Sequence, residues 1–327
     1  MCVVYRAFSA SIEVSFYVII IYIRKKIKII TANKYFKERF GQKVYKLSLD
    51  AGCTCPNRDG TLGTKGCIFC SNGGSGEFAA SRNKSITSQI EEAKERVESK
   101  MPKDSTSNKY IAYFQAFTNT YGDAKELKAK YLEAAKCPDI VALSIATRPD
   151  CISDDILDII SDINKTCPVF IELGLQTIHE DTAEYIRRGY KLDIYEDAIR
   201  RLDERSIDVI THIIIGLPGE SEEMMLQSVE YVKDISEKCK NITCGIKLQL
   251  LHVLKGTDLL EDYNNGVFEV LNLEEYVDII YKSLSILKDK VVVHRLTGDG
   301  DKNLLVAPLW SANKKLVINE LSKCYYV

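Results

Sequence analysis

Short runs of β-branched and aromatic residues alternate with longer charged stretches of helical period, starting at residue 44. Strand-like runs cover residues 44–49, 111–115, 141–147, 170–175, 209–215, 246–252 and 291–296. Helix-like stretches cover residues 88–100, 124–135, 154–163, 193–204, 222–238 and 273–288. This order of strand and then helix, repeated six times, is typical of βα units around a parallel sheet.

Six such units fit either a partial barrel or an open doubly wound sheet, and the periodicity does not separate the two. The placement of polar residues favours the barrel, because Gln115, Arg148, Gln176 and His252 stand at or just after the predicted strand ends. Barrel enzymes place their chemistry at that edge. We therefore predict an α/β fold, a partial (β/α)6 TIM-like barrel over residues 33–316, with a C-terminal tail over residues 317–327.

The N-terminal segment needs a separate interpretation. Residues 14–23 are strongly apolar and residues 24–28 are mostly basic. The apolar run is short for a membrane span, which needs about 20 residues, and it lacks the basic start and cleavage site of a signal peptide. We expect residues 1–32 to be an extension outside the barrel and expect no membrane span; an interfacial anchor is the alternative.

Charge and cysteine content limit the function classes. The 44 basic and 46 acidic residues leave a net charge of -2, so no whole-chain field attracts nucleic acid or a membrane, although a local basic patch is compatible with this balance. Eleven cysteines in a chain of 327 residues without an export signal indicate free thiols and a reducing, cytoplasmic location.

Four cysteines lie close together directly after the first predicted strand. Residues 50–60 read DAGCTCPNRDG, and residues 66–70 read GCIFC. Soft thiolate ligands suit an iron-sulfur cluster, and the glycines let one loop fold around it. A structural zinc ion held by all four thiolates is the competing interpretation. One residue between Cys53 and Cys55 is poor geometry for a zinc knuckle, but spacing alone leaves both interpretations open.

The pattern C-x11-C-x2-C from Cys55 to Cys70, in the longer form CPNRDG…GCIFC, resembles the radical S-adenosylmethionine (SAM) proteins of the YhcC/YtqA type. These are relatives of the elongator catalytic subunit and of oxygen-independent coproporphyrinogen oxidase, and the resemblance covers residues 35–316. It implies a 4Fe-4S cluster on Cys55, Cys67 and Cys70, with Cys53 as a spare thiol. It also implies that SAM binds the fourth iron and that an external electron donor drives its cleavage to a 5'-deoxyadenosyl radical.

The same resemblance implies the SAM contacts. Gln115 and Asn119 correspond to the segment that receives the SAM ammonium. Polar groups for the ribose hydroxyls and the SAM carboxylate follow the third and fourth strands and the next turn; they are Arg148, Glu172, Gln176 and Arg188. Gly216 and Pro218 resemble the turn that packs against the adenine.

The last two strand ends are expected to meet the substrate. Their polar residues are His252, Lys255, His294, Arg295 and Asp299. In a barrel these loops face the open mouth, and their basic groups suit an anionic partner.

Residues 297–301 and 307–310 are most similar to the YtqA branch, also called MnmL. This resemblance implies a transfer RNA (tRNA) substrate, whose carboxymethylaminomethyl wobble uridine is converted to the aminomethyl form. The near-neutral charge argues mildly against RNA. A small carboxylated or porphyrin-like metabolite is the second enzymatic hypothesis, and a zinc-bound or cluster-bound interaction module is the non-enzymatic one.

Overall fold

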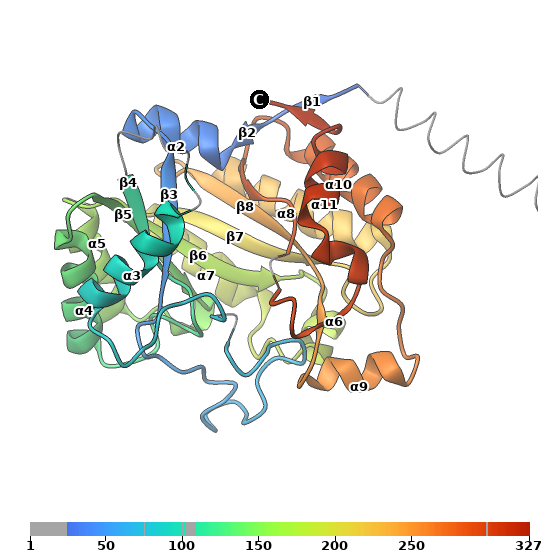
Figure 1. Ribbon diagram of the computed structural model, residues 1–327, viewed down its shortest axis with the longest axis horizontal. Coiled ribbons are helices and arrows are strands. Elements are labelled where there is room, and N and C mark those ends of the chain that lie inside the picture. The colour runs from blue at the N-terminus through green and yellow to red at the C-terminus, as the bar shows by residue number, and fades with distance from the viewer. Residues whose placement is uncertain (1–24, 75, 100, 102–108, 299) are drawn as a thin grey trace, which may run out of the picture.

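The computed structural model describes residues 25–74, 76–99, 101, 109–298 and 300–327, and every structural statement below concerns these residues. Its centre is a curled sheet of eight parallel strands in the order β2-β10-β8-β7-β6-β5-β4-β3 (Figure 1). The strands are β2 (Ile30–Thr31), β3 (Val44–Leu49), β4 (Lys109–Phe114), β5 (Ile140–Thr147), β6 (Val169–Gln176), β7 (Asp208–Ile215), β8 (Cys244–Leu250) and β10 (Val292–Arg295). This half-barrel confirms the predicted fold class.

One helix follows each of the six strands from β3 to β8 and returns the chain to the next strand. These helices are α3 (Ile86–Glu98), α4 (Ala124–Lys136), α5 (Asp154–Asn164), α7 (Leu192–Asp203), α8 (Glu222–Lys238) and α10 (Leu273–Leu287). Four begin at a side chain that accepts a backbone N–H of the first turn: Ser85, Asp123, Ser221 and Asn272. Such caps stabilise the first turn and fix where each helix starts.

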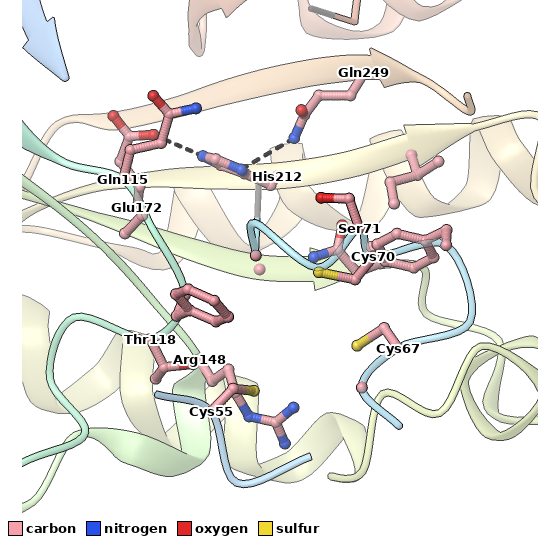
Figure 2. Close-up of a pocket in the computed structure, with 18 of the residues that line it drawn as sticks. Cys55, Cys67, Cys70, Ser71, Gln115, Thr118, Arg148, Glu172, His212 and Gln249 are labelled. Atoms are coloured by element: carbon pink, nitrogen blue, oxygen red, sulfur yellow. Dashed lines mark hydrogen bonds and ion pairs between the residues drawn. The ribbon is translucent and has the colours of Figure 1, made fainter. Parts of the chain in front are cut away.

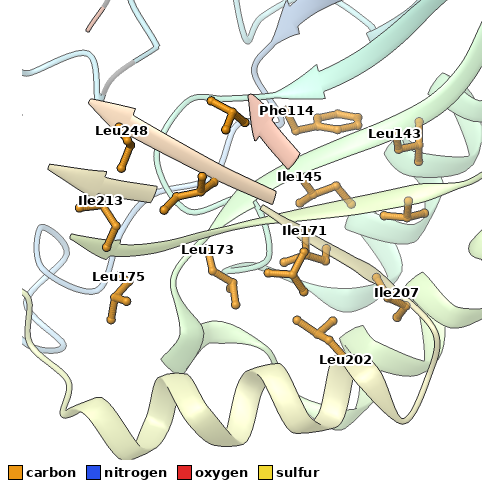
Figure 3. Close-up of a cluster of buried hydrophobic side chains, with 14 of the residues drawn as sticks. Phe114, Leu143, Ile145, Ile171, Leu173, Leu175, Leu202, Ile207, Ile213 and Leu248 are labelled. Carbon is orange, nitrogen blue, oxygen red and sulfur yellow. The ribbon is translucent and has the colours of Figure 1, made fainter. Parts of the chain in front are cut away.

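The main core lies between the outer face of the sheet and these helices. Every second strand residue points toward the helices, as the pleat requires, and Figure 3 shows this layer where α7 crosses the sheet. Its central members are fully or almost fully buried: Phe114, Leu143, Ile145, Ile171, Leu173, Leu175, Leu202, Ile207, Ile213 and Leu248. This apolar layer holds the strands at fixed positions, so their carboxyl ends form a stable edge for a site.

Helix α2 (Ala32–Phe40) closes the amino-terminal end of the curl. Phe36 packs on Ile111 and Phe170 near the starts of β4 and β6, and Arg39 forms an ion pair with Asp208 at the start of β7. The inside of the half-barrel is therefore blocked at this end and open at the carboxyl ends of the strands.

Both chain ends depart from the predicted boundaries. Strand β1 (Ile27–Lys28) pairs with β12 (Tyr325–Tyr326), and β2 joins the main sheet beside β10. Segment 27–31 therefore belongs to the folded domain, and the predicted tail belongs to it too, because α11 (Lys314–Leu321) buries Val317 and Leu321. Strands of two residues are too short to show a periodicity in the sequence, and β1 depends on pairing with β12, about 300 residues away.

Smaller elements complete the fold around the open end. They are α6 (Glu180–Tyr185), α9 (Asp258–Asn264), a two-stranded sheet of β9 (Val253–Leu254) and β11 (Leu305–Ala307), and the 3-10 helices Pro149–Cys151 and Leu309–Ala312. Among the described helices none is long and apolar enough to cross a bilayer. The apolar run at residues 14–23 lies outside the described residues.

Candidate functional site

A cavity of about 260 Å³ opens at the carboxyl ends of the strands, between the cysteine loop and the inner face of the sheet (Figure 2). Ten of the predicted site residues line it: Cys55, Cys67, Cys70, Gln115, Arg148, Glu172, Gln176, Arg188, His252 and Arg295. They come from segments up to 240 residues apart in the chain. The structure therefore brings most of the predicted site into one place.

The cysteine loop is held in shape by its own side chains. Arg58 donates hydrogen bonds to the carbonyl oxygens of Cys70 (3.0 Å) and Ser71 (2.6 Å). Gly66 adopts φ +79°, and a Cβ there would lie 2.8 Å from the Arg58 guanidinium, so only glycine fits beside it. Asn57 donates to the Cys67 sulfur at 3.4 Å and to the Arg187 carbonyl at 2.6 Å, which fastens the loop to the turn after α6.

The donor set distinguishes the two metal interpretations. Cys55, Cys67 and Cys70 face the same cavity, whereas Cys53 is buried in the hydrophobic core. A structural zinc site of four thiolates needs all four sulfurs around one ion, and the core position of Cys53 separates it from the other three. Three thiols that border one cavity fit a cluster that leaves one iron open.

Gln176 carries an acceptor that has no partner in the protein. It ends β6 with φ +69°, an uncommon conformation for a residue other than glycine. Its Oε1 is buried without a hydrogen-bond partner among the described residues. Because a buried unpaired amide oxygen is unfavourable, the arrangement fits a ligand that donates a hydrogen bond, such as a ribose hydroxyl.

Two arginines border the cavity near the cysteines. Arg148 forms two parallel hydrogen bonds with Asp150, at 2.9 and 2.7 Å. Arg188 is 2% exposed and donates to the carbonyl oxygens of Thr177 (2.6 Å) and Tyr190 (2.9 Å). Both guanidinium groups lie over the Tyr190 ring, at 5.3 and 4.7 Å from its centroid. Arg188 thus orders the turn, and each guanidinium is paired with a carboxylate, Arg148 with Asp150 and Arg188 with Glu180 at 3.1 Å.

Three residues expected to contact SAM lie outside the cavity lining. Asn119 is fully buried and donates to the carbonyl oxygens of Phe114 (3.0 Å) and Ala146 (3.1 Å), so its amide clamps the ends of β4 and β5. Gly216 and Pro218 form the turn after β7, where a Cβ on Gly216 would lie 3.1 Å from Leu271. All three follow strand ends, as predicted, but the sequence does not show whether a residue there borders the cavity.

Glu172 lines the cavity, but its carboxylate is already saturated by protein donors. Oε1 accepts from Lys46 and from Ser144 (2.5 Å), and Oε2 accepts from Lys247 and His212 (2.8 Å). A carboxylate has about four acceptor positions. The four donors fill them, so the ribose contact expected of Glu172 gives way to a role in organising the cavity floor.

This floor is the part of the site that sequence reasoning missed. Lys247, His212 and Tyr113 all line the cavity, on β8, β7 and β4. Burial lowers the pKa of Lys247 to about 7, although Glu172 opposes this shift, and burial also lowers the pKa of His212 to about 4. The available signal was a polar residue inside an apolar strand, as in IKLQL around Lys247. Strands covered on both faces are usually apolar throughout.

The five predicted substrate residues separate in space. His252 and Arg295 line the cavity, while Lys255 lies outside its lining and donates to the Asn303 carbonyl at 2.9 Å. His294 instead packs against Phe36 at the closed end, with ring centroids 5.5 Å apart. The register of β10 on β8 shifts between Val293 and Arg295; such a bulge redirects side chains. Asp299 lies outside the described residues.

Comparisons with known proteins agree with this architecture. Residues 57–232 match the family described as the Radical SAM superfamily, and residues 243–325 match the Radical_SAM C-terminal domain. The structure of the Elp3 protein of Methanocaldococcus infernus, with an N-terminal deletion, is similar with a TM-score of 0.62 at 20% identity, over 86% of this chain and 63% of that one. This likeness supports the fold.

Curated relatives are similar over most of their length. The uncharacterized protein YtqA of Bacillus subtilis is 42% identical over 90% of this chain and 88% of its own, and the protein YhcC of Escherichia coli K12 is 35% identical over 87% and 88%. A tRNA uridine(34) acetyltransferase of Methanocaldococcus jannaschii is 28% identical over 53% of this chain and 31% of its own. The chain is a member of the radical SAM superfamily, in the group of YtqA and YhcC.

Proposed function

We propose that this protein cleaves SAM reductively at a 4Fe-4S cluster held by Cys55, Cys67 and Cys70, and that it acts on the wobble uridine of tRNA. The specific conversion proposed is from carboxymethylaminomethyl uridine to aminomethyl uridine. One observation carries the proposal: three cysteines of one loop face a cavity whose other wall includes several polar side chains of the sheet.

The residues that line the cavity would have separate roles in holding the cluster and SAM. Cys55, Cys67 and Cys70 would hold the cluster, and Gln176 would accept a hydrogen bond from SAM. Bound together, the cluster and SAM supply a radical that abstracts hydrogen from the substrate. The described side chains around them position the reactants and limit the access of water. The external electron donor is a separate partner.

The tRNA assignment is supported by the relatives. The name of the Methanocaldococcus jannaschii relative gives uridine 34 of tRNA as its substrate, and that protein is 28% identical to this chain over 173 residues. Two Elongator complex protein 3 chains, from fission and budding yeast, match over about half of this chain. Proteins commonly read RNA loops through single unstacked bases, which is the kind of contact that a site of this type would make.

The test is a single-turnover assay without oxygen. Reconstituted protein is incubated with SAM, a reductant and tRNA that carries carboxymethylaminomethyl uridine, and nucleosides and 5'-deoxyadenosine are measured by mass spectrometry. We expect aminomethyl uridine and 5'-deoxyadenosine to appear together. Formation of 5'-deoxyadenosine without any change of the uridine would retain the radical SAM activity and contradict the substrate.

A further inference from the structure

A second carboxylate lines the cavity, on the side of the cysteine loop. Of the described lining residues, only Glu172 and Glu77 are acidic. Glu172 is already saturated by its four donors. Ser71 donates its hydroxyl to Oε1 of Glu77, and no other described residue pairs with that carboxylate. Glu77 is half-buried, and its carboxylate therefore keeps acceptor positions open for a ligand.

The loop before Glu77 is packed so closely on the residues after β4 that it fixes the position of this side chain. Gly74 adopts φ +58°, and a Cβ there would lie 2.4 Å from the Phe117 ring. A Cβ on Gly76 would lie 2.4 Å from the Cβ of Ala116. Only glycine allows such close approaches. The Phe117 N–H also donates to the Gly74 carbonyl oxygen at 2.9 Å, so the loop is held against the sheet and Glu77 is held at the cavity.

The Glu77 carboxylate lies close to the expected cluster ligands. Its partner Ser71 directly follows Cys70, and Figure 2 shows these two residues together at the edge of the cavity. Thiolates and a carboxylate around one cavity repel one another, and partial burial makes an uncompensated charge more unfavourable. A ligand that donates hydrogen bonds to Glu77 would remove this conflict.

The amino acid end of SAM carries such a donor. An open iron takes nitrogen or oxygen ligands, and SAM offers one of each in its amine and its carboxylate. The carboxylate of Glu77 repels the SAM carboxylate and attracts the amino group, which is an ammonium in free SAM. Asn119, one of the two residues expected to receive this group, instead clamps β4 and β5.

We infer that Glu77 accepts a hydrogen bond from the amino group of SAM and thereby orients SAM at the cluster. Ser71 is a positioning residue, because its hydroxyl fixes one oxygen of the Glu77 carboxylate. This inference rests on the proposed function, since it takes SAM as the ligand of the cavity.

A pair of ligands tests the inference without turnover. The ligands are SAM and 5'-[(3-carboxypropyl)methylsulfonio]-5'-deoxyadenosine, an analogue that lacks only the amino group. Dissociation constants are measured by equilibrium dialysis without oxygen, on reconstituted holoenzyme whose cluster is left oxidised so that SAM is not cleaved. A charge-assisted hydrogen bond predicts that Glu77→Gln weakens SAM binding by about 10- to 100-fold. Binding of the analogue should change by no more than about twofold, because it lacks the coupled group.

Two further variants serve as controls. The matched change Glu95→Gln, at an exposed position of α3, should leave both dissociation constants unchanged. Ser71→Ala keeps the carboxylate and removes its protein partner, so the ratio of the two constants should stay within about threefold of the wild-type ratio. Iron and sulfide content shows that each variant retains its cluster.

Three results would overturn the inference. One is that Glu77→Gln weakens the binding of both ligands by the same factor, which would indicate a structural role. Another is that it changes neither constant. The third is weaker binding of tRNA at an unchanged SAM affinity, since Glu77 would then contact the substrate.

The two proposals fail in distinguishable ways. If Glu77→Gln weakens SAM binding alone but the wild type does not convert tRNA, the assignment of Glu77 stands and the proposed tRNA substrate is refuted. If the wild type converts tRNA but Glu77→Gln affects both ligands equally, the proposed function stands and the assignment of Glu77 is refuted.

Discussion

At the scale of single residues, two cysteines separated by one residue have different environments. Cys55 lines the cavity, but Cys53, two positions earlier, packs in the core at 6% exposure. The resemblance to radical SAM proteins predicted this division, and spacing did not, because C-x-C allows either thiol to point either way. Similarly, Lys247 stands out in the structure because its strand neighbours are apolar, whereas its partner Glu172 lies 75 residues away in the chain.

Replacement of the cluster cysteines gives the first prediction. Cys55→Ala, Cys67→Ala and Cys70→Ala should each reduce the iron content of reconstituted protein from about four atoms per chain to near zero, since each removes one of three ligands. Cys53→Ala should keep its iron and sulfide, as measured by metal analysis and visible absorption. Loss of the cluster in Cys53→Ala would contradict the ligand assignment.

His212 gives a prediction for pH dependence. Burial lowers its pKa from 6.5 to about 4, among Glu172, Lys247 and Arg295. Between pH 6.5 and 4 the unfolded chain therefore binds more protons than the folded one, so stability falls as the pH falls. From pH 7 to 5 the wild type should lose about 1–2 kcal/mol more unfolding free energy than His212→Asn. Urea denaturation at both pH values measures this; equal losses would contradict the assigned pKa.

At the scale of elements, long strands and helices were predictable and short ones were not. Strand β3 and helix α8 match their predicted ranges, because their apolar periodicity extends over whole elements. Strands β1, β2 and β12 have two residues each, and they exist only through pairing with distant segments. Helix α2 was missed although Thr31 caps it and Gly41 ends it, because the predicted elements began only at residue 44.

The inclusion of β2 in the sheet gives a prediction of stability. Ile29, between β1 and β2, is 1% exposed. Ile29→Ala should lower the unfolding free energy by about 2–4 kcal/mol, the usual effect of truncating a buried isoleucine. Exposed Lys28→Ala is the control and should change stability by less than about 0.5 kcal/mol. Chemical denaturation checks both, and an unchanged Ile29→Ala would mean that the segment is not part of the core.

The clamp between β4 and β5 gives a further prediction. Asn119→Ala removes two buried donors and leaves the Phe114 and Ala146 carbonyl oxygens with fewer partners. We expect a loss of about 1–3 kcal/mol in stability and no more than a twofold change in SAM affinity. Denaturation and equilibrium binding measure the two effects. A large loss of SAM affinity at unchanged stability would restore Asn119 as a direct SAM contact.

At the scale of the whole molecule, the half-barrel explains why distant residues form one site. Parallel strands end at the same edge, and α2 closes the opposite edge, so loops after most of the strands meet around one opening. The near-neutral net charge holds for the whole chain, but it conceals a cavity floor where Lys46 and Lys247 both pair with the buried carboxylate of Glu172. Composition averages over the surface and therefore could not reveal it.

The central claim is that this cavity cleaves SAM at a cluster on the cysteine loop. The most direct measurement is 5'-deoxyadenosine formed by reconstituted, reduced protein without oxygen, compared between the wild type and Cys67→Ala. The account predicts 5'-deoxyadenosine from the wild type and none above background from Cys67→Ala. Equal amounts from both proteins, or none from a wild type that contains its full complement of iron and sulfide, would contradict it.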